Sequence, residues 1–383
     1  MHIACIHQGY ELYGSDRCFA ESIRTIRALA PDARITVVLP RPGPILDLLH
    51  GLADEILYEP LWILRRRGLA RLATLGLLRL PLALARAARR LATCDLVYVN
   101  TTVVADYLIA ARLFPGRTIL HVHEIPEGLV RRVLRLLVRW SGAEVVFNSQ
   151  ATRAAFALPA CADTRVIYNG IAGPAAPEPV TYDGTRPLRL LMLGRISRIK
   201  GQEVLLDAIA ALPAAVRARI ELRIVGSAFE DAAREAALAA RIGDSGMDGR
   251  ITLRPFDPDP APHYRWADVV VVPSRLPESL GRVAIEAMAY GRPPVVSAIG
   301  GLVEVVEAGR TGWTVPPDDA AALSAALAAI VADPGSLAAR APAARRRFET
   351  LFSEAAVGRA FAAMLAPRLA RKPRAAAPAV VHS

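Results

Sequence analysis

Hydrophobic and polar positions along this 383-residue chain follow two alternating patterns. Short runs rich in β-branched residues recur, and between them lie stretches with apolar residues at three- and four-residue intervals. The runs are typical of buried parallel strands, and the stretches are typical of amphipathic helices. The predicted strands of the first half are HIACIH (2–7), ITVVL (35–39), LVYV (96–99), TILHV (118–122), EVVFN (144–148) and RVIYN (165–169). This alternation predicts an α/β fold with parallel sheets.

The alternation begins again after residues 172–187, a segment rich in proline and glycine that indicates a linker. The second half has predicted strands at 188–193, 220–225, 269–273 and 294–298, and predicted helices near 201–212, 230–241, 282–290 and 318–332. Two such series predict two doubly wound domains that face each other across a cleft. Ligands of such sheets bind at the carboxyl ends of the strands, so the strand-to-helix turns are the places to search for chemistry.

The expected organisation has five parts. They are a first Rossmann-like domain, a linker, a second Rossmann-like domain, a C-terminal helix that packs back on the first domain, and a disordered tail, at residues 1–175, 176–187, 188–345, 346–366 and 367–383. A length of 383 residues is comfortable for two domains of this kind.

The cysteines argue against a secreted, disulfide-rich protein. Cys5, Cys18, Cys94 and Cys161 are scattered singly without a CxxC pair, which disfavours a disulfide framework or a zinc site and suits a reducing compartment. The N-terminal residues show no signal peptide pattern, and no uncharged run of 18 apolar residues predicts a transmembrane helix. We therefore expect a cytoplasmic protein, peripheral at most on the inner face of the cell membrane.

The formal net charge of +11 predicts anionic partners. Residues 61–94 contain many arginines and no acid, and residues 129–140, LVRRVLRLLVRW, have the helical spacing of a basic amphipathic helix. We expect these two segments to dock on an anionic membrane surface; the alternative is that they are solvated surface helices of an arginine-rich protein. Nucleic acid is disfavoured because exposed aromatic residues are not interleaved with the basic ones.

One turn in the second half has the composition of an anion site. In LMLGRISRIKGQEVLL, Gly194 ends a predicted strand, Gly201 opens a predicted helix, and Arg195 and Lys200 lie between them. A helix N-terminus presents unpaired amides and a positive dipole end. Two added cations make this turn suitable for a diphosphate. The alternative is a solvated basic loop.

A pair of glutamates follows in PESLGRVAIEAMAYGRP. Glu278 lies in the loop before a predicted helix, and Glu286 lies inside that helix, where its side chain leans back toward the N-terminus. The amides of Leu280–Val283 lie between them as a second anion seat. We expect each carboxylate to accept hydrogen bonds from vicinal sugar hydroxyls; the alternative is a capping acid and a helix acid paired with a basic residue.

Together, GRISRIKG and ESLGRVAIEAMAYGRPPVVSAIGG resemble the C-terminal half of retaining GT-B glycosyltransferases of family four, the glycosyl transferases group 1. The resemblance implies that Arg195 and Lys200 bind the donor diphosphate, that Glu286 binds the ribose and that Glu278 lies beside the transferred sugar. Implied further contacts with the donor come from Gly194, Gly201, Leu280, Gly281, Arg282 and Val283. This sequence departs from the family at Leu280 and Arg282, so the donor preference is not inherited, and Arg282 is expected either at the phosphates or facing the acceptor.

The first half resembles the family at fewer places. GYELYGSDR resembles the acceptor-side loop of the family at Gly14 and Ser15, and ILHVHEIPE resembles its strand that ends in histidine and an acid. The resemblance places His123 near the sugar. His121 is a rival, and either histidine is alternatively a hydrogen-bonded core residue.

The predicted activity is a retaining, metal-independent transfer of a sugar from a nucleotide diphosphate to an acceptor hydroxyl, such as that of a glycan or lipid-linked saccharide, in polysaccharide or glycolipid synthesis. No cofactor is expected, because the basic turn and the helix amides would stabilise the leaving diphosphate; DPDP at 257–260 is a poor metal motif because of its prolines. The resemblance indicates front-face attack with catalytic roles for Arg195, Lys200, Glu278 and His123. The alternatives are another GT-B enzyme, such as an epimerase or phosphorylase, and a non-catalytic nucleotide-sugar-binding membrane partner.

Overall fold

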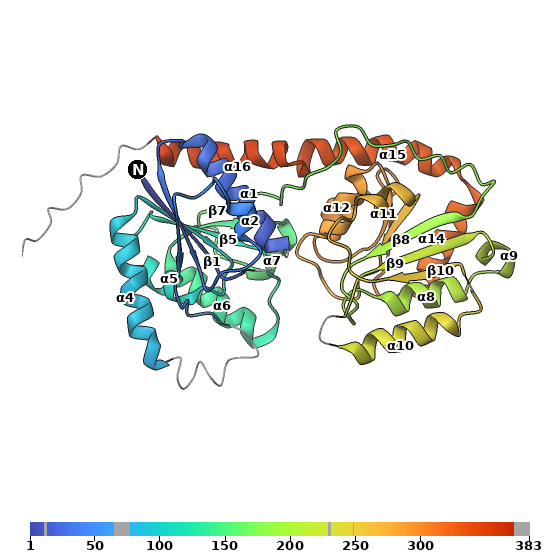
Figure 1. The fold of residues 1–383 in the computed structure, drawn as a ribbon, viewed down its shortest axis with the longest axis horizontal. Coiled ribbons are helices and arrows are strands. Elements are labelled where there is room, and N and C mark those ends of the chain that lie inside the picture. Colours follow the sequence, from blue (N-terminus) through green and yellow to red (C-terminus); the bar gives the residue numbers. More distant parts are fainter. Residues whose placement is uncertain (11–13, 65–76, 229–230, 248, 371–383) are drawn as a thin grey trace, which may run out of the picture. The chain divides into compact units, whose positions relative to one another are not determined.

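The structure, a computed structural model, describes residues 1–383 except 11–13, 65–76, 229–230, 248 and 371–383, and it forms two α/β units (Figure 1). Unit 1 comprises Met1–Gly170 and the chain from Val357 onward, and unit 2 comprises Ile171–Ala356. Each unit is built on one parallel sheet with helices packed on it. The predicted α/β class with two doubly wound sheets is therefore confirmed.

Unit 1 contains seven strands in the order β3-β2-β1-β4-β5-β6-β7. Their bounds are β1 (His2–His7), β2 (Arg34–Leu39), β3 (Glu55–Tyr58), β4 (Leu96–Asn100), β5 (Thr118–Val122), β6 (Glu144–Phe147) and β7 (Thr164–Val166). The helices with described bounds are α1 (Gly14–Leu29), α2 (Leu46–Leu49), α4 (Leu77–Thr93), α5 (Ala105–Ala111), α6 (Gly128–Ser141), α7 (Gln150–Phe156) and α16 (Glu354–Leu369).

The two faces of this sheet are covered by different helices because successive strand residues point to opposite sides. Ile3 and Cys5 of β1 pack in one buried cluster with residues of α1, α2 and α16. Ala4 and Ile6 pack in another cluster with residues of α4, α5 and α6. Both faces of the sheet are thus shielded from solvent, which explains why the strand sequences are continuous apolar runs.

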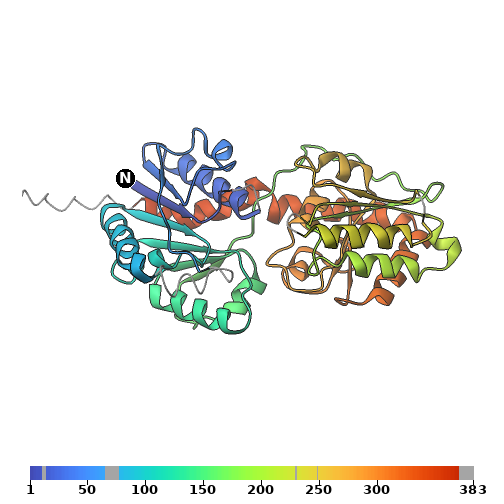
Figure 2. The same ribbon diagram turned by 60° about the horizontal axis from the view of Figure 1, so that its bottom comes forward.

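Unit 2 contains six strands in the order β10-β9-β8-β11-β12-β13. Their bounds are β8 (Leu188–Leu193), β9 (Ile220–Val225), β10 (Ile251–Arg254), β11 (Val269–Val272), β12 (Pro294–Ser297) and β13 (Trp313–Val315). The helices are α8 (Gln202–Ala210), α9 (Ala214–Arg217), α10 (Ala232–Gly243), α11 (Ala261–Trp266), α12 (Arg282–Ala289), α13 (Leu302–Val305), α14 (Ala320–Ala332), α15 (Gly335–Arg347) and the π-helical η3 (Phe348–Phe352). Helices α8 and α10 lie side by side on this unit (Figure 2).

The C-terminal region differs from the prediction in detail. Instead of one helix over 346–366, the chain passes through η3, leaves helical geometry at Ser353 and continues as α16. Because α16 runs to Leu369, the predicted tail does not begin at residue 367, and residues 371–383 lie outside the described part. The segment 172–187 contains no helix or strand.

The described residues contain no single helix that is long and apolar enough to cross a membrane. Helix α14 together with Gly335–Phe352 reaches the required length and composition only as a pair bent by 106°.

Candidate functional site

The basic turn of unit 2 connects β8 to α8. Gly201 is the N-cap residue of α8 and has a φ of 78°, a conformation that favours glycine. A Cβ atom at this position would lie 2.1 Å from the carbonyl oxygen of Pro273, so only glycine lets the helix start approach the end of β11. Gln202 closes the turn, because its Nε2 donates to the Arg195 carbonyl oxygen at 3.0 Å.

Lys200 and Glu278 form an ion pair, with 2.8 Å between Nζ and Oε1. Only 24% of the Lys200 side chain and 12% of the Glu278 side chain are exposed, so water screens this pair less than a surface pair. The Ser274 hydroxyl donates to the same carboxylate oxygen. The loop that carries Glu278 is held by the Gly301 amide, which donates to the Glu278 carbonyl oxygen at 2.8 Å.

Glu286 lies on α12, which begins after the N-cap residue Gly281. Its carboxylate accepts from Arg282 Nε at 2.6 Å and from the Tyr264 hydroxyl at 2.7 Å. Burial, together with the neighbouring Glu286, raises the pKa of Tyr264 well above its usual value, so the hydroxyl remains protonated. From the sequence, Arg282 was expected either at the phosphates or facing the acceptor. In the structure its partner is Glu286, which agrees with the alternative of a helix acid paired with a basic residue.

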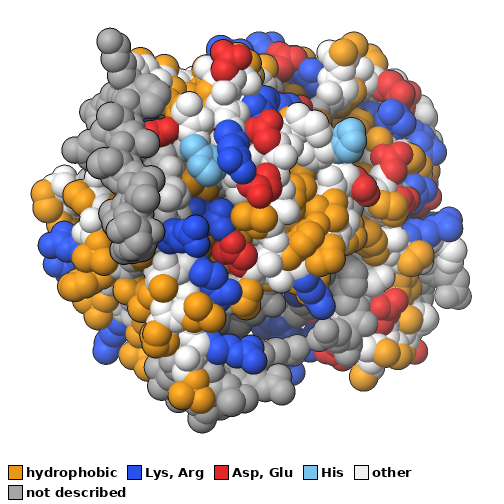
Figure 3. Space-filling view, turned by 60° about the vertical axis from the view of Figure 1, so that its left-hand side comes forward, with side chains coloured by type: hydrophobic (Ala, Val, Ile, Leu, Met, Phe, Trp, Pro, Cys, Tyr) orange, Lys and Arg blue, Asp and Glu red, His pale blue; other side chains and the backbone are white. Residues whose placement is uncertain are grey.

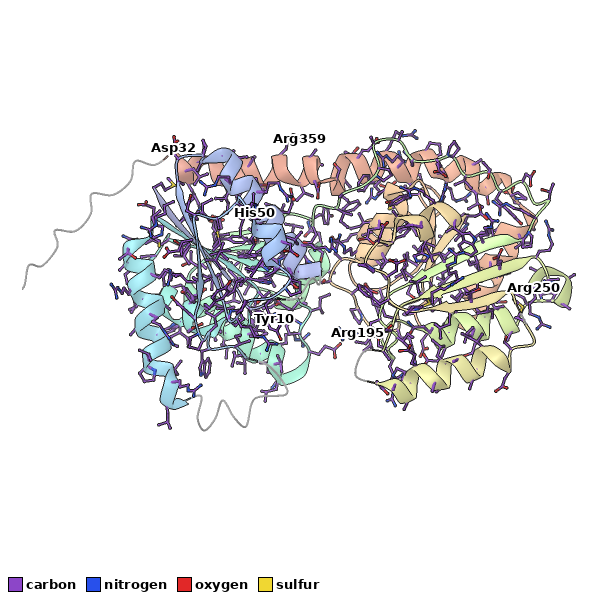
Figure 4. The ribbon with its side chains drawn as sticks, viewed as in Figure 1. Tyr10, Asp32, His50, Arg195, Arg250 and Arg359 are labelled. Carbon is purple, nitrogen blue, oxygen red and sulfur yellow. The ribbon has the colours of Figure 1, made fainter. Side chains whose placement is uncertain are left out.

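The structure therefore groups the predicted residues of unit 2 into two ion pairs, Lys200 with Glu278 and Arg282 with Glu286. The turn with Lys200 and the loop with Glu278 follow β8 and β11, which are neighbours in a parallel sheet, so both leave the sheet at its carboxyl edge. The other residues predicted to bind the donor lie in the same two segments: Gly194, Arg195, Leu280, Gly281 and Val283. Arg195 lies just beyond β8 (Figure 4).

Sequence reasoning missed three polar groups of this site: Gln202, Ser274 and Tyr264. Gln202 and Ser274 are adjacent to predicted turns, so their positions carried some signal. Tyr264 carried none, because it lies on α11, some twenty residues before its partner Glu286.

The DPDP segment lies in unit 2, and its two aspartates form hydrogen bonds with residues that follow closely in the sequence. The Asp257 carboxylate lies 3.0 Å from Nε2 of His263, and the Asp259 carboxylate accepts from the amide of Ala261 at 3.1 Å. A hollow of about 430 Å³ next to it is lined by Arg223, Arg254, Pro255, Phe256, Asp257, Pro258 and His263. The prolines thus belong to a turn before α11.

The candidate residues of unit 1 form a buried polar chain. His123 Nε2 lies 2.8 Å from Asn100 Oδ1, and Asn100 Nδ2 lies 3.0 Å from His7 Nδ1. His7 Nε2 in turn lies 2.6 Å from Asp16 Oδ1. Asn100 also lies close to the predicted acceptor-side residues, since its Nδ2 is 3.5 Å from the carbonyl oxygen of Ser15.

Gly14 and Ser15 occupy the first turn of α1, and residues 11–13 of the resembling segment lie outside the described part. The segment that was compared with a loop is thus a helix start at these two positions.

His121 and His123 share one side of the chain, with ring centroids 4.1 Å apart. His121 Nδ1 contacts the Tyr98 hydroxyl at 2.7 Å. Burial lowers the pKa of His121 to about 3. Burial, followed by the neighbouring His121 and His7, lowers the pKa of His123 well below its usual value, an effect that Asn169 partly offsets. Both imidazoles are therefore neutral at pH 7, and neither is poised there as a general acid.

Two doubly wound parallel units, the second with a basic turn and a glutamate-flanked helix at its carboxyl edge, are the architecture of the GT-B glycosyltransferases. Residues 187–333, which lie in the second unit, match the family described as Glycosyl transferases group 1.

Two relatives match part of the chain. It is 36% identical over 272 residues to a glycogen synthase of Mycobacterium tuberculosis, covering 68% of this chain and 61% of the relative. It is 40% identical over 149 residues to a D-inositol 3-phosphate glycosyltransferase of Arthrobacter sp., covering 38% of this chain and 35% of the relative. The chain thus spans less than two thirds of these relatives.

Solved structures match almost the whole chain. Anabaena HepE, in complex with UDP and glucose, superposes with a TM-score of 0.75 at 25% identity, covering 95% of this chain and 99% of HepE. Sucrose-phosphate synthase of Thermosynechococcus elongatus has a TM-score of 0.74 at 23% identity, covering 96% of this chain and 99% of that protein. At this level of identity, the match supports the fold only.

Proposed function

We propose that the protein is a glycosyltransferase that moves a sugar from a nucleotide diphosphate to an acceptor hydroxyl. The observation that carries the proposal is the Lys200–Glu278 ion pair, held at the carboxyl edge of the unit 2 sheet by Ser274 and by the start of α8. A cation and an acceptor carboxylate in direct contact offer adjacent places for a phosphate oxygen and a sugar hydroxyl.

The ion pair also suggests how the donor engages the site. A diphosphate at Lys200 competes with Glu278 for the ammonium group, so donor binding releases the Glu278 carboxylate to accept from sugar hydroxyls. Negative charge on the leaving diphosphate grows as the glycosidic bond breaks, and Lys200 together with the amides at the starts of α8 and α12 binds that charge more tightly in the transition state. The reaction then needs no metal ion at the diphosphate.

We further propose that the anomeric configuration is retained through front-face attack, with the leaving phosphate accepting the proton of the acceptor hydroxyl. The roles of Arg195, Glu286 and His123 at the diphosphate, ribose and sugar belong to this proposal. Proton NMR of the first-formed product tests it, because an inverted anomeric signal contradicts front-face attack. Full turnover in the presence of EDTA is the expected result for a metal-independent reaction.

UDP-glucose is the first donor to test, since HepE has been solved with UDP-glucose. We expect UDP and the correct nucleotide sugar to raise the unfolding temperature, because ligands that bind only the folded state stabilise it. Consumption of donor only when an acceptor is present supports a transferase. Conversion of the donor alone indicates an epimerase, and a requirement for inorganic phosphate indicates a phosphorylase.

We also propose that unit 1 docks on an anionic lipid surface through α6 and α4. Four large apolar side chains of α6 face solvent, Leu129, Val133, Leu136 and Trp140, with exposures of 73%, 46%, 63% and 56%. Their spacing of three and four residues places them along one side of the helix. This stripe is separate from the inward side, where Leu134 and Val138 are buried.

Basic residues flank the exposed stripe of α6. Arg131, Arg132 and Arg139 are exposed, and α6 contains no acidic residue. Helix α4 adds Leu78 and Leu82, which are 79% and 60% exposed, and Figure 3 views the side on which α4 lies, where hydrophobic and basic side chains occur next to one another. Apolar residues at the acyl boundary with arginines at the headgroups are the arrangement of an interfacial helix. Flotation with anionic and with neutral vesicles tests this; equal absence from both contradicts it.

A further inference from the structure

Three side chains of the types that bind soft metal ions, one cysteine and two histidines, lie close together inside unit 1. Cys18 lies on α1, His121 lies on β5, and His123 follows the end of that strand. One possible ligand atom from each residue, a sulfur or a ring nitrogen, lies within 4.8 Å of the others. Cys18 and His121 are only 5% and 2% exposed, so the fold holds them together in the interior.

The hydrogen-bond network assigns the tautomer of His123. Asn100 Nδ2 donates to His7 Nδ1, while His7 Nε2 donates to the Asp16 carboxylate, and this chain orients the Asn100 oxygen toward His123. Because that oxygen only accepts, His123 Nε2 carries the proton. The lone pair is then on Nδ1, which is buried without a hydrogen-bond partner among the described residues.

A similar arrangement holds His121. The Tyr98 hydroxyl lies 2.7 Å from His121 Nδ1 and 3.0 Å from the Ser22 hydroxyl, which itself donates to the Cys18 carbonyl oxygen. When Tyr98 donates to Ser22, it accepts from His121 Nδ1. This leaves the lone pair on His121 Nε2, a second buried nitrogen without a partner in the described part of the chain.

We propose that unit 1 binds one soft transition-metal ion of the zinc type through Cys18 Sγ, His121 Nε2 and His123 Nδ1. A thiolate with two imidazoles suits Zn²⁺, Co²⁺ or Cu⁺. With Zn–N and Zn–S bonds of about 2.0 and 2.3 Å, the edges of a tetrahedral site are about 3.5 Å, so the ligand atoms need to approach by roughly 1 Å. A cavity of about 10 Å³, lined in part by Cys18 and His121, has about the volume that one water molecule needs.

The surrounding groups already serve the roles that metal ligands require. Metal-bound histidines donate their second N–H to an oxygen, and here Asn100 and Tyr98 are those acceptors. The Cys18 thiol, which donates to Asn169 Oδ1 at 3.3 Å, passes its proton to solvent when the sulfur binds the ion. Affinity therefore increases with pH. Three protein ligands leave a fourth position for water.

Metal binding has a consequence that rests on the proposed function. An ion bound to His123 Nδ1 fixes the ring that we assign to the donor sugar, so zinc slows sugar transfer. It leaves nucleotide binding by unit 2 unchanged. The site is thus inhibitory and distinct from the metal-free chemistry at the diphosphate.

Cobalt titration of the full-length chain tests the site. The Cys161→Ser variant serves as the reference because Cys161 is the exposed cysteine among four. We expect one Co²⁺ per chain with the near-ultraviolet absorption band of a thiolate–cobalt bond. The band is lost in Cys18→Ser, is weakened in His121→Asn and persists in Cys94→Ala, with circular dichroism to confirm folding. A missing band in the reference protein, or an unchanged band in Cys18→Ser, overturns the proposal.

X-ray absorption of the zinc-loaded reference protein gives a result that needs no variant at the site. One sulfur and two imidazole nitrogens in the zinc shell support the site, and a shell without sulfur overturns it. UDP-dependent stabilisation and sugar transfer are then measured separately, each with and without zinc. Zinc is expected to slow the transfer and to leave the stabilisation by UDP unchanged. If cobalt binds with a thiolate but no transfer occurs under any condition, the proposed function fails and the metal site remains.

Discussion

Lysine is rare in this chain and therefore informative at the residue scale. Only two of the 47 basic residues are lysines, Lys200 and Lys372, and all others are arginines. Lys200 nevertheless lies at the turn where a diphosphate is expected, in contact with Glu278. A compact ammonium group with rotatable donors can contact a carboxylate and a phosphate oxygen in a narrow space, whereas a planar guanidinium requires a wider one.

Replacing Lys200 tests this reading. We expect Lys200→Met to lower kcat/KM by about 100-fold, the loss typical of one charge-stabilising group, and Lys200→Arg to recover little of it. Steady-state assays with the donor identified by thermal shift measure the effect. Arg198→Met is the matched control, since Arg198 is an exposed cation of the same turn and should keep near-normal turnover. Normal turnover of Lys200→Met would remove the diphosphate assignment.

Asp106 links the charge of one residue to stability. It lies in the first turn of α5, is buried, and accepts from the amide of Trp62 at 3.2 Å. Burial raises the pKa of Asp106 to about 6, against an ordinary value of 3.8. The folded state therefore holds the proton more tightly than the unfolded state, so the stability that neutral Asp106 supports is present below pH 4 and is lost as the pH rises through 6.

Asp106→Asn, which cannot ionise, separates this effect from all others. Relative to the variant, we expect the free energy of unfolding of the natural protein to fall between pH 4 and pH 7 by up to about 3 kcal/mol, since one pKa unit corresponds to 1.36 kcal/mol. Urea denaturation at both pH values measures the difference. Parallel pH dependence in the two proteins would show that folding does not raise the pKa of Asp106.

At the scale of elements, the sequence predicted the central strands and missed three of the four edge strands; the fourth, β7 (Thr164–Val166), overlaps the predicted strand at 165–169. Glu55–Tyr58, Ile251–Arg254 and Trp313–Val315 were not predicted, and they are β3, β10 and β13, each at the end of a sheet. An edge strand is paired on one side only and covered less fully, so it carries a weaker apolar pattern. In β3 no residue is fully buried, whereas every residue of β4 is.

For helix α6, the periodicity of the sequence predicted fewer apolar sides than the structure has. A basic amphipathic pattern predicts one apolar side, yet the structure divides the apolar residues between an inward side with Leu134 and Val138 and an outward stripe. The inward side packs α6 against α5. In the outward stripe, Trp140 also contacts α5, because its Nε1 donates to the Ile109 carbonyl oxygen at 3.4 Å. Leu129, Val133 and Leu136 are therefore the stripe residues with which we test the membrane proposal.

Replacing Leu129, Val133 and Leu136 together by serine is expected to lower binding to anionic vesicles at least 10-fold. About 0.8 kcal/mol is lost for each CH₂ group that no longer enters the lipid. Flotation at several salt concentrations measures it. Arg131→Gln with Arg132→Gln should instead reduce binding mainly at low salt, because the electrostatic part is screened. Unchanged flotation of the serine variant contradicts docking through α6.

At the scale of the whole molecule, local sequence patterns identified the turns of unit 2 but not the contacts between distant segments. Lys200 and Glu278 were assigned to one site because their turns follow strands of one series. Cys18, His121 and His123 were not, because neither spacing nor periodicity relates a residue on α1 to the end of β5. Only strand order brings them together: β1 lies next to β4 and β4 next to β5.

The same reasoning applies to the end of the chain, because α16 follows unit 2 in sequence but completes the core of unit 1. Phe361, Met364 and Leu365 are buried in the cluster that contains Ile3 and Tyr98, and the Phe361 ring packs edge-on against Tyr98 with centroids 5.8 Å apart. Each unit thus has a core of its own, and a cavity made by truncating Phe361 should weaken unit 1 selectively.

We expect Phe361→Ala to destabilise unit 1 by about 3–5 kcal/mol, the usual cost of this truncation in a core. Calorimetry with and without UDP measures it: one transition moves to lower temperature, while the UDP-dependent increase of the other persists because unit 2 keeps its nucleotide site. Arg359→Ala, on the exposed side of the same helix, is the control and should leave both transitions in place (Figure 4). If Phe361→Ala lowers both transitions equally and abolishes the response to UDP, the two cores do not unfold independently.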